Sequence, residues 1–284
     1  MSGWFRNPWG RPRWLLLITV VYILWSIVPV AIAILFAFNN GRSRTTWQGF
    51  STRWFTGETG SVLHDPSLQN ALQHTLVLAA ICVLVATPLG VALALGLQRW
   101  RGRGAGSVNT MMLLPLVTPE IVMGVALLLL FLKVFPGLGL GTTAQSIGQV
   151  TFTLSYVVVI VRGRLVSIGP EYEEAAADLG APPRDQLLRV LLPLLAPAII
   201  SSAAVVFALS IDDFVVTQWL ASDAGTTTVS MLLYSSARAA PTPALNAIAT
   251  VTLGITLLTL AFAYVVYRRF AGGREAAVAT ALEV

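Results

Sequence analysis

Three carboxylates, Glu120, Asp212 and Asp213, lie within apolar stretches that are long enough to cross a membrane. A charged side chain near the centre of a membrane helix costs roughly 2.5–3.5 kcal/mol on insertion scales, so such groups usually face a pathway or a partner. No basic residue is clearly placed at the same depth, although Lys133 and Arg162 lie at the ends of neighbouring stretches. Unpaired carboxylates in this position favour a site for a cationic solute.

Asp212 and Asp213 are adjacent, and adjacent helical residues point about 100° apart, so both cannot face one pathway. One carboxylate would line the pathway while the other pairs with a neighbouring helix or subunit. Alternatively, Ser210–Asp213 is a local break that caps a new helical segment, or the carboxylates only satisfy backbone and hydroxyl groups.

Aromatic side chains complete the candidate pathway, because a cationic amine binds an aromatic face by cation–π contact. A solute with several amines on methylene stems would use both kinds of group. The candidate pathway residues are Glu120, Ser210, Asp212, Asp213, Trp47, Trp219 and Tyr234.

A second group of charges has a different pattern. Five of the thirteen acidic residues fall between Glu171 and Asp185. Glu171, Glu174 and Asp178 recur at helical spacing and share one face. Gly180 is placed to end this helix in a left-handed cap, and the two prolines after it prevent its continuation. The pattern predicts a helix, a turn and a second helix, with an ordinary solvated loop as the alternative.

The elements that position these residues are membrane helices. The chain is 56% hydrophobic and 11% charged, with a mean hydropathy of +0.76. A helix needs about 20 apolar residues to cross a bilayer. The fourth apolar stretch is the weakest because Gln149 and several hydroxyl residues dilute it, and a re-entrant helix is its alternative. The six predicted spans are 14–38, 72–97, 111–132, 147–161, 197–220 and 245–267.

The basic residues predict the orientation. With both termini in the cytoplasm, 13 of the 18 Lys and Arg residues lie on the cytoplasmic side. Residues 39–70 then form an external loop, and residues 170–196 and the tail 268–284 are cytoplasmic. The first span, 14–38, is longer than the apolar core of a secretory signal, so we expect a retained helix. We expect one transmembrane domain over 1–284, with its core at about 70–270.

The charged segment resembles the EAA motif of ABC-importer permeases. Glu174-Ala175-Ala176, three residues, Gly180, nine residues and Val190-Leu191-Leu192-Pro193 match that family's spacing, with Val190 in place of isoleucine. The resemblance implies that residues 170–196, the coupling segment, dock on an ATP-binding subunit. The coupling residues that it implies are Glu174, Ala175, Ala176, Gly180, Leu192 and Pro193.

Further stretches are similar to spermidine/putrescine permeases of the C-subunit type: TWQGF (46–50), TPEIVMG (118–124), LSIDDFVVTQW (209–219) and ALNAIAT (244–250). Two departures are Pro182-Pro183 after the glycine and Glu120 where relatives often carry aspartate. The resemblance implies an all-α type I ABC importer permease with a MetI-like transmembrane domain in the bacterial inner membrane. It also implies a second permease subunit that forms a heterodimer with this chain, two ATP-binding subunits and an extracytoplasmic substrate-binding protein.

Several chemistries find no support in the sequence. It has no phosphate-binding loop of the G-x-x-x-x-G-K-[ST] type, and Lys133 is the only lysine. His64, expected in a loop, and His74, expected as a cap or at the interface, have no metal-binding spacing, and Cys82 is the only cysteine. We expect no catalytic residue, metal or cofactor in this chain, with ATP bound by partner subunits.

The sequence thus predicts a permease subunit that moves polyamines across the membrane. The alternatives are an ABC permease for ferric ion, an opine or another amine, and a stand-alone secondary transporter. An intramembrane enzyme is a further alternative.

Overall fold

A computed structural model describes residues 13–43, 46–57, 60–100, 102–239 and 242–282. These residues are nearly all helical, and their only β-type pairing is an isolated bridge between Asn39 and Phe50. The chain divides into two compact units. The first comprises the described parts of Met1–Asp65 and Pro241–Thr250, and the second those of Pro66–Ala240 and Val251–Val284.

The first unit contains α1 (Arg13–Ala37) and the short helix α2 (Arg53–Thr56). The predicted first span is confirmed as a helix, and its apolar window is buried by no other described part of the protein. After α1 the chain folds on itself around Asn39, whose carbonyl accepts a 2.7 Å hydrogen bond from the indole of Trp54. Phe38 stacks on Phe50, with ring centroids 5.5 Å apart. Polar and aromatic contacts therefore give the predicted external loop a defined structure.

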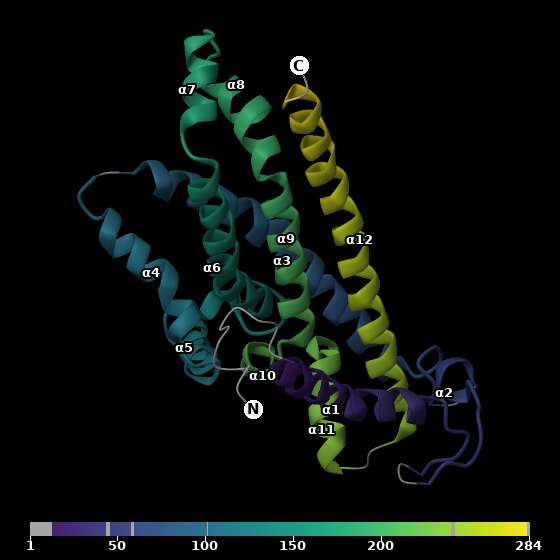
Figure 1. The fold of residues 1–284 in the computed structure, drawn as a ribbon. Helices are drawn as coiled ribbons and strands as arrows, with labels where there is room; N and C mark the ends of the chain where they lie inside the picture. The colour runs from purple at the N-terminus through teal and green to yellow at the C-terminus, as the bar shows by residue number, and fades with distance from the viewer. Residues whose placement is uncertain (1–12, 44–45, 58–59, 101, 240–241, 283–284) are drawn as a thin grey trace. The chain divides into compact units, whose positions relative to one another are not determined.

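The core of the second unit is formed by α3 (Pro66–Arg99), α6 (Thr142–Ile168) and α9 (Leu192–Asp212) (Figure 1). Small side chains let these helices approach closely. A Cβ added at Gly90 of α3 would lie 2.5 Å from the Cβ of Val157 on α6, a distance that real Cβ atoms do not adopt. The fourth predicted span is confirmed as α6, and 61% of its apolar window is buried. Gln149, Thr153 and Ser155 are buried in the core, whereas Thr151 is exposed.

Two predicted spans are interrupted. The third, 111–132, consists of α4 (Ala105–Val117) and α5 (Glu120–Lys133), which are bent by 111° to one another. The fifth, 197–220, is divided into α9 and α10 (Val215–Leu220). Among the described residues, five helices are long and apolar enough to span a membrane, or six if the bent pair is one span. A 3₁₀ turn, η1 (Pro136–Leu138), lies between α5 and α6. After α10 the chain forms a second 3₁₀ turn, η3 (Ala224–Thr226), and the helices α11 (Val229–Ala239) and α12 (Pro243–Leu282).

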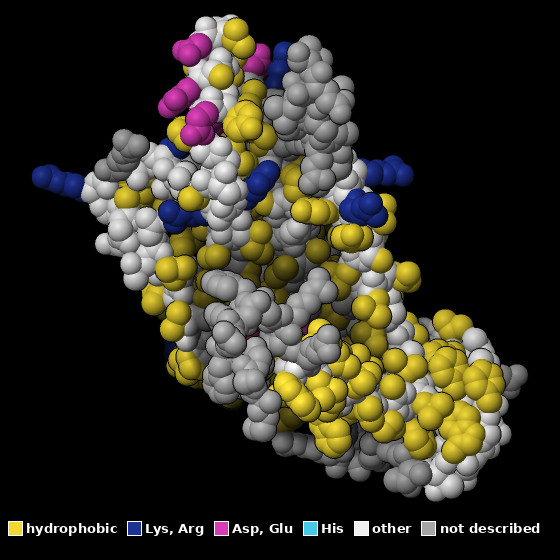
Figure 2. Space-filling model, in the orientation of Figure 1, with side chains coloured by type: hydrophobic (Ala, Val, Ile, Leu, Met, Phe, Trp, Pro, Cys, Tyr) yellow, Lys and Arg dark blue, Asp and Glu magenta, His cyan; other side chains and the backbone are white. Residues whose placement is uncertain are grey.

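The coupling segment projects from one end of α6 and α9, and α10 and α11 lie at the opposite end (Figure 1). The segment comprises α7 (Glu171–Asp178), α8 (Pro183–Asp185) and a π-helical stretch, η2 (Gln186–Leu191), that leads into α9. The space-filling view shows acidic side chains gathered at this end, with Lys and Arg side chains nearer the middle (Figure 2). The predicted helix–turn–helix is therefore present, although its second helix contains a π-helical stretch between α8 and α9.

Candidate functional site

The first helix break places Glu120 at the beginning of α5. Thr118 is extended, with ψ 129°, as expected for a residue that precedes proline, and its hydroxyl donates to the carbonyl of Leu114. Pro119 then starts a helix in a new direction. Glu120 is exposed in the first turn of α5, where the helix dipole favours a negative charge. Glu120 therefore lies at a helix break, and not inside one continuous helix over 111–132 as the sequence predicted.

The second break separates Asp212 from Asp213. The Asp213 carboxylate accepts hydrogen bonds from the backbone N–H groups of Val216 and Thr217, each at 3.1 Å, and so caps α10. Its Oδ2 also accepts from Nε2 of Gln149 on α6, at 3.1 Å. The sequence-based alternative of a break that caps a new helix is thus confirmed. The Asp213 side chain thus joins α10 to α6, and the three groups that donate to it all belong to this chain.

Gln149 joins this cap to α9. Its side-chain oxygen accepts a 2.6 Å hydrogen bond from the hydroxyl of Ser210, and its nitrogen donates to the Ser210 carbonyl. Gln149 and Ser210 are 1% and 3% exposed, respectively. Ser210, a candidate pathway residue, is therefore engaged inside the protein.

Asp212 differs from its neighbour in both exposure and bonding. It is the last residue of α9 and is exposed. Among the described residues, the only ion pairs are Arg99–Glu173 and Arg189–Asp185, so none joins Asp212, Asp213 or Glu120 to a basic side chain. α5, which begins at Glu120, packs against α10, which follows Asp213, so the two breaks adjoin contacting helices. No ion pair with a described Lys or Arg compensates the carboxylates at these breaks.

Aromatic residues flank the breaks. Trp219 on α10 packs against Gly124 on α5, since a Cβ at Gly124 would lie 2.7 Å from Cδ1 of Trp219. Trp219 remains 41% exposed. Tyr234 on α11 packs against Phe214 with the rings tilted by 35° and their centroids 4.3 Å apart. The structure therefore places Trp219 against α5 one turn beyond Glu120, and brings Tyr234 together with Phe214.

Trp47 is the one predicted pathway residue in the first unit. Its ring meets Phe36 edge-on, with centroids 6.3 Å apart. The structure gives it no defined place relative to the helix breaks.

A second polar group on α6 was also missed from the sequence. Gln145 is buried, receives a 2.8 Å hydrogen bond from Nε2 of His74, and donates to the carbonyls of Thr217 and Thr226. The expectation of His74 at the interface or as a cap is wrong, because α3 begins at Pro66 and buries it. The spacing of Gln145, Gln149 and Thr153 by four residues was the available signal, since it defines one helix face.

The coupling segment has the turn that its sequence predicts. Gly180 has φ +80°, its N–H donates to the carbonyl of Ala177, and the N–H of Ala181 donates to that of Ala176. These two bonds form a Schellman cap. Glu174 and Ala175 are exposed and Ala176 is half-buried. Leu192 and Pro193 open α9, next to Leu191 and Leu195 in the core.

Residues 86–272 match the family described as binding-protein-dependent transport system inner membrane component. The putrescine transport system permease protein PotI of Escherichia coli (strain K12) is 35% identical over 252 residues, which cover 87% of this chain and 88% of PotI. The spermidine/putrescine transport system permease protein PotC of the same strain is 34% identical over 84% of this chain and 88% of PotC. The molybdenum transport system permease protein ModB of Mycobacterium bovis is 34% identical over 73% of this chain and 76% of ModB.

Solved structures show the same fold. A bacterial ABC transporter involved in the import of alginate matches with a TM-score of 0.72 at 18% identity, over 90% of this chain and 96% of that chain. The MetNI methionine ABC transporter matches with a TM-score of 0.57 at 17% identity, over 71% and 93% of the two chains. Fold and membrane helices together define a multi-pass permease of the type I ABC importer class. The chain belongs to the family of binding-protein-dependent transport system inner membrane components.

Proposed function

We propose that this permease translocates polyamines and that its coupling segment transmits the action of ATP-binding subunits. The observation that carries the substrate class is the pair of exposed carboxylates, Glu120 and Asp212, at the two helix breaks. Neither forms an ion pair with a described Lys or Arg. A solute with separated ammonium groups supplies the positive charges that these carboxylates lack, and Trp219 offers an aromatic face to an ammonium group by cation–π contact.

The similar permeases support this solute class and separate it from others. PotI and PotC are named for putrescine and spermidine, whereas ModB is named for molybdenum. Exposed carboxylates without a compensating cation would repel an oxyanion. Ferric ion and opines remain the alternatives that share some of this chemistry, and a transport assay separates them.

The exposed surface of α7 supports a protein partner at the coupling segment. Tyr172 is 55% exposed and Leu179 is 90% exposed, beside the acidic side chains of Glu171 and Glu174. An apolar residue next to carboxylates suits a groove with basic rims. We assign this surface to an ATP-binding subunit, which binds and hydrolyses ATP. The proposed assembly contains a second permease subunit, two ATP-binding subunits and an extracytoplasmic binding protein.

The test is transport by the reconstituted complex with Glu120→Gln, Asp212→Asn and the double variant. Loss of a hydrogen bond to a charged group costs about 1.5–3 kcal/mol, so each single variant should raise the apparent KM for putrescine or spermidine about ten- to hundred-fold. Asp223→Asn is the matched control, because Asp223 caps η3 through the N–H of Gly225 and asparagine retains that ability.

Uptake is measured for putrescine, spermidine, ferric ion and molybdate in the same proteoliposomes. Unchanged amine uptake in the double variant contradicts the assigned carboxylates. Transport of another solute with no amine uptake by the wild type contradicts the substrate class.

A further inference from the structure

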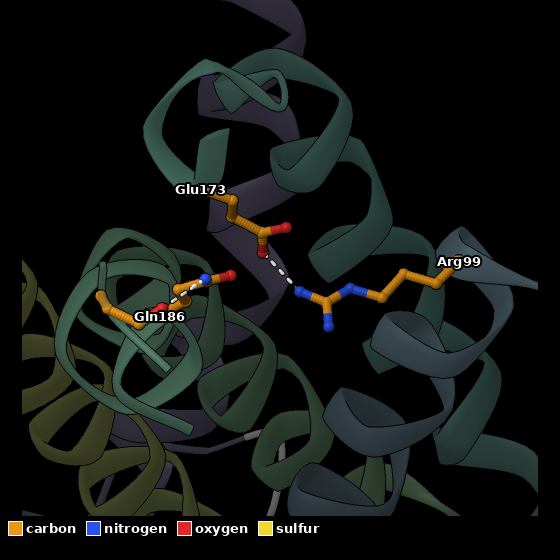
Figure 3. Close-up of polar contacts among 4 residues, drawn as sticks. Arg99, Glu173 and Gln186 are labelled. Atoms are coloured by element: carbon orange, nitrogen blue, oxygen red, sulfur yellow. Dashed lines mark hydrogen bonds and ion pairs between the residues drawn. The ribbon is translucent and has the colours of Figure 1, made fainter. Parts of the chain in front are cut away.

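An ion pair joins the coupling segment to the end of a core helix. Arg99, the last residue of α3, contacts Glu173 in the first turn of α7 (Figure 3). The other ion pair among the described residues, Arg189–Asp185, lies within the coupling segment. Arg99–Glu173 is therefore the described ion pair that crosses from the segment to a membrane helix.

Besides the ion pair with Arg99, the helix that carries Glu173 contacts mainly η2 of the same segment. α7 has no buried residue and lies between two glycines in the left-handed region, Gly169 at φ +74° and Gly180 at φ +80°. At a φ of +74° a residue with a Cβ is strained, so the turn at Gly169 requires glycine. Because α7 has eight residues, no buried side chain and a tight turn at each end, its position depends on the contacts at its ends and sides.

A cleft of about 530 Å³ lies beside this ion pair. Gln98 and Leu95 of α3, Leu165 of α6, and Leu191 of η2 line it together with Arg99 and Glu173. The cleft leaves room for α7 to move toward α3 and α6. The ion pair is placed to resist or transmit that movement.

We propose that Arg99 and Glu173 are positioning residues that transmit displacement of the coupling segment to α3. This inference rests on the proposed role of the segment in docking an ATP-binding subunit. Glu173 and Glu174 then have separate tasks: Glu173 is turned to Arg99, while Glu174 is exposed and available to the partner. Exposed ion pairs contribute little to folding stability, so the effect falls on coupling rather than on assembly.

The test uses charge reversal in the complete complex, purified through a tag on this chain. Arg99→Glu and Glu173→Arg should each reduce solute transported per ATP hydrolysed at least five-fold, because like charges then face each other. The double variant restores the opposite charges and should return the ratio to within two-fold of wild type. Arg103→Glu, an exposed arginine four positions further on, is the matched control and should leave the ratio unchanged.

A second measurement does not depend on the solute. Gln98→Cys and Pro170→Cys, at two residues that line the cleft, are combined and cross-linked with and without ATP; the native Cys82 is buried. The cross-linking yield should change with ATP in the wild-type and double charge-reversal backgrounds, and not in Arg99→Glu. An equal response in all backgrounds, or no rescue by the double variant, overturns the inference. Normal cross-linking behaviour without amine transport instead contradicts only the polyamine assignment.

Discussion

Asp212 and Asp213 show how far the roles of neighbouring residues diverge at a helix break. Asp213 accepts three hydrogen bonds from Gln149, Val216 and Thr217, whereas Asp212 is exposed beside it. The same side-chain chemistry thus stabilises the protein at one position and is available to a solute at the next. A substitution series separates the two roles.

Asp213→Ala should destabilise the purified complex by about 1–3 kcal/mol, because it leaves backbone and amide donors without their acceptor. Asp212→Ala should leave stability unchanged in the absence of solute. Thermal unfolding followed by intrinsic fluorescence measures both. Equal melting temperatures for Asp213→Ala and wild type would contradict the capping role.

At the scale of the elements, the packing of α3 on α6 depends on glycine at one position and not at another. Gly90 faces Val157 at contact distance, whereas a Cβ at Gly96 of the same helix would meet nothing within 4 Å. Gly90 is also buried. The two glycines therefore form a matched pair on one helix.

We expect Gly90→Ala to destabilise the permease by about 1–3 kcal/mol through overpacking. Gly96→Ala should be neutral or stabilising by up to about 1 kcal/mol, since alanine favours a helix over glycine. Resistance to thermal unfolding and the yield of the assembled complex are the measurements. A loss of stability in Gly96→Ala alone would refute this account of the interface.

Some of these helices and turns follow from the local sequence, whereas the bend at Pro119 does not. Apolar length located five membrane-length helices among the described residues, and a sixth if the bent pair α4 and α5 is one span, and Gly180 with its prolines located the turn of the coupling segment. Hydropathy did not reveal the bend at Pro119, because the residues on both sides are equally apolar. It also ranked α6 as the weakest span, although Gln145 and Gln149 bond to groups of other elements.

The candidate site was less predictable than the spans because it depends on contacts between elements. Residue type identified Glu120, Asp212 and Asp213, and local spacing allowed a cap at Asp213. Neither could show that Gln149 is the partner, since the two residues are 64 positions apart. The contact of Arg99 with Glu173 is a further long-range pairing that no local pattern contains.

For the whole molecule, the distribution of basic residues predicts that the coupling segment faces the cytoplasm. Two variants, each with one introduced cysteine, test the side of the membrane on which each segment lies. Leu179→Cys is at a residue of the coupling segment that is 90% exposed, and Ala224→Cys is at an exposed residue of η3. An impermeant maleimide should label Ala224→Cys in intact spheroplasts and Leu179→Cys only after permeabilisation. The reverse pattern would invert the proposed orientation.

The difference between the exposed Asp212 and the capping residue Asp213 has an evolutionary consequence. In the proposed site, a lineage that exchanges Asp212 changes a solute contact while the hydrogen bonds that hold α10 to α6 remain intact. A lineage that exchanges Asp213 must first replace an acceptor for three donors. The proposal therefore predicts that cargo preference drifts by single substitutions at position 212, while position 213 stays constrained.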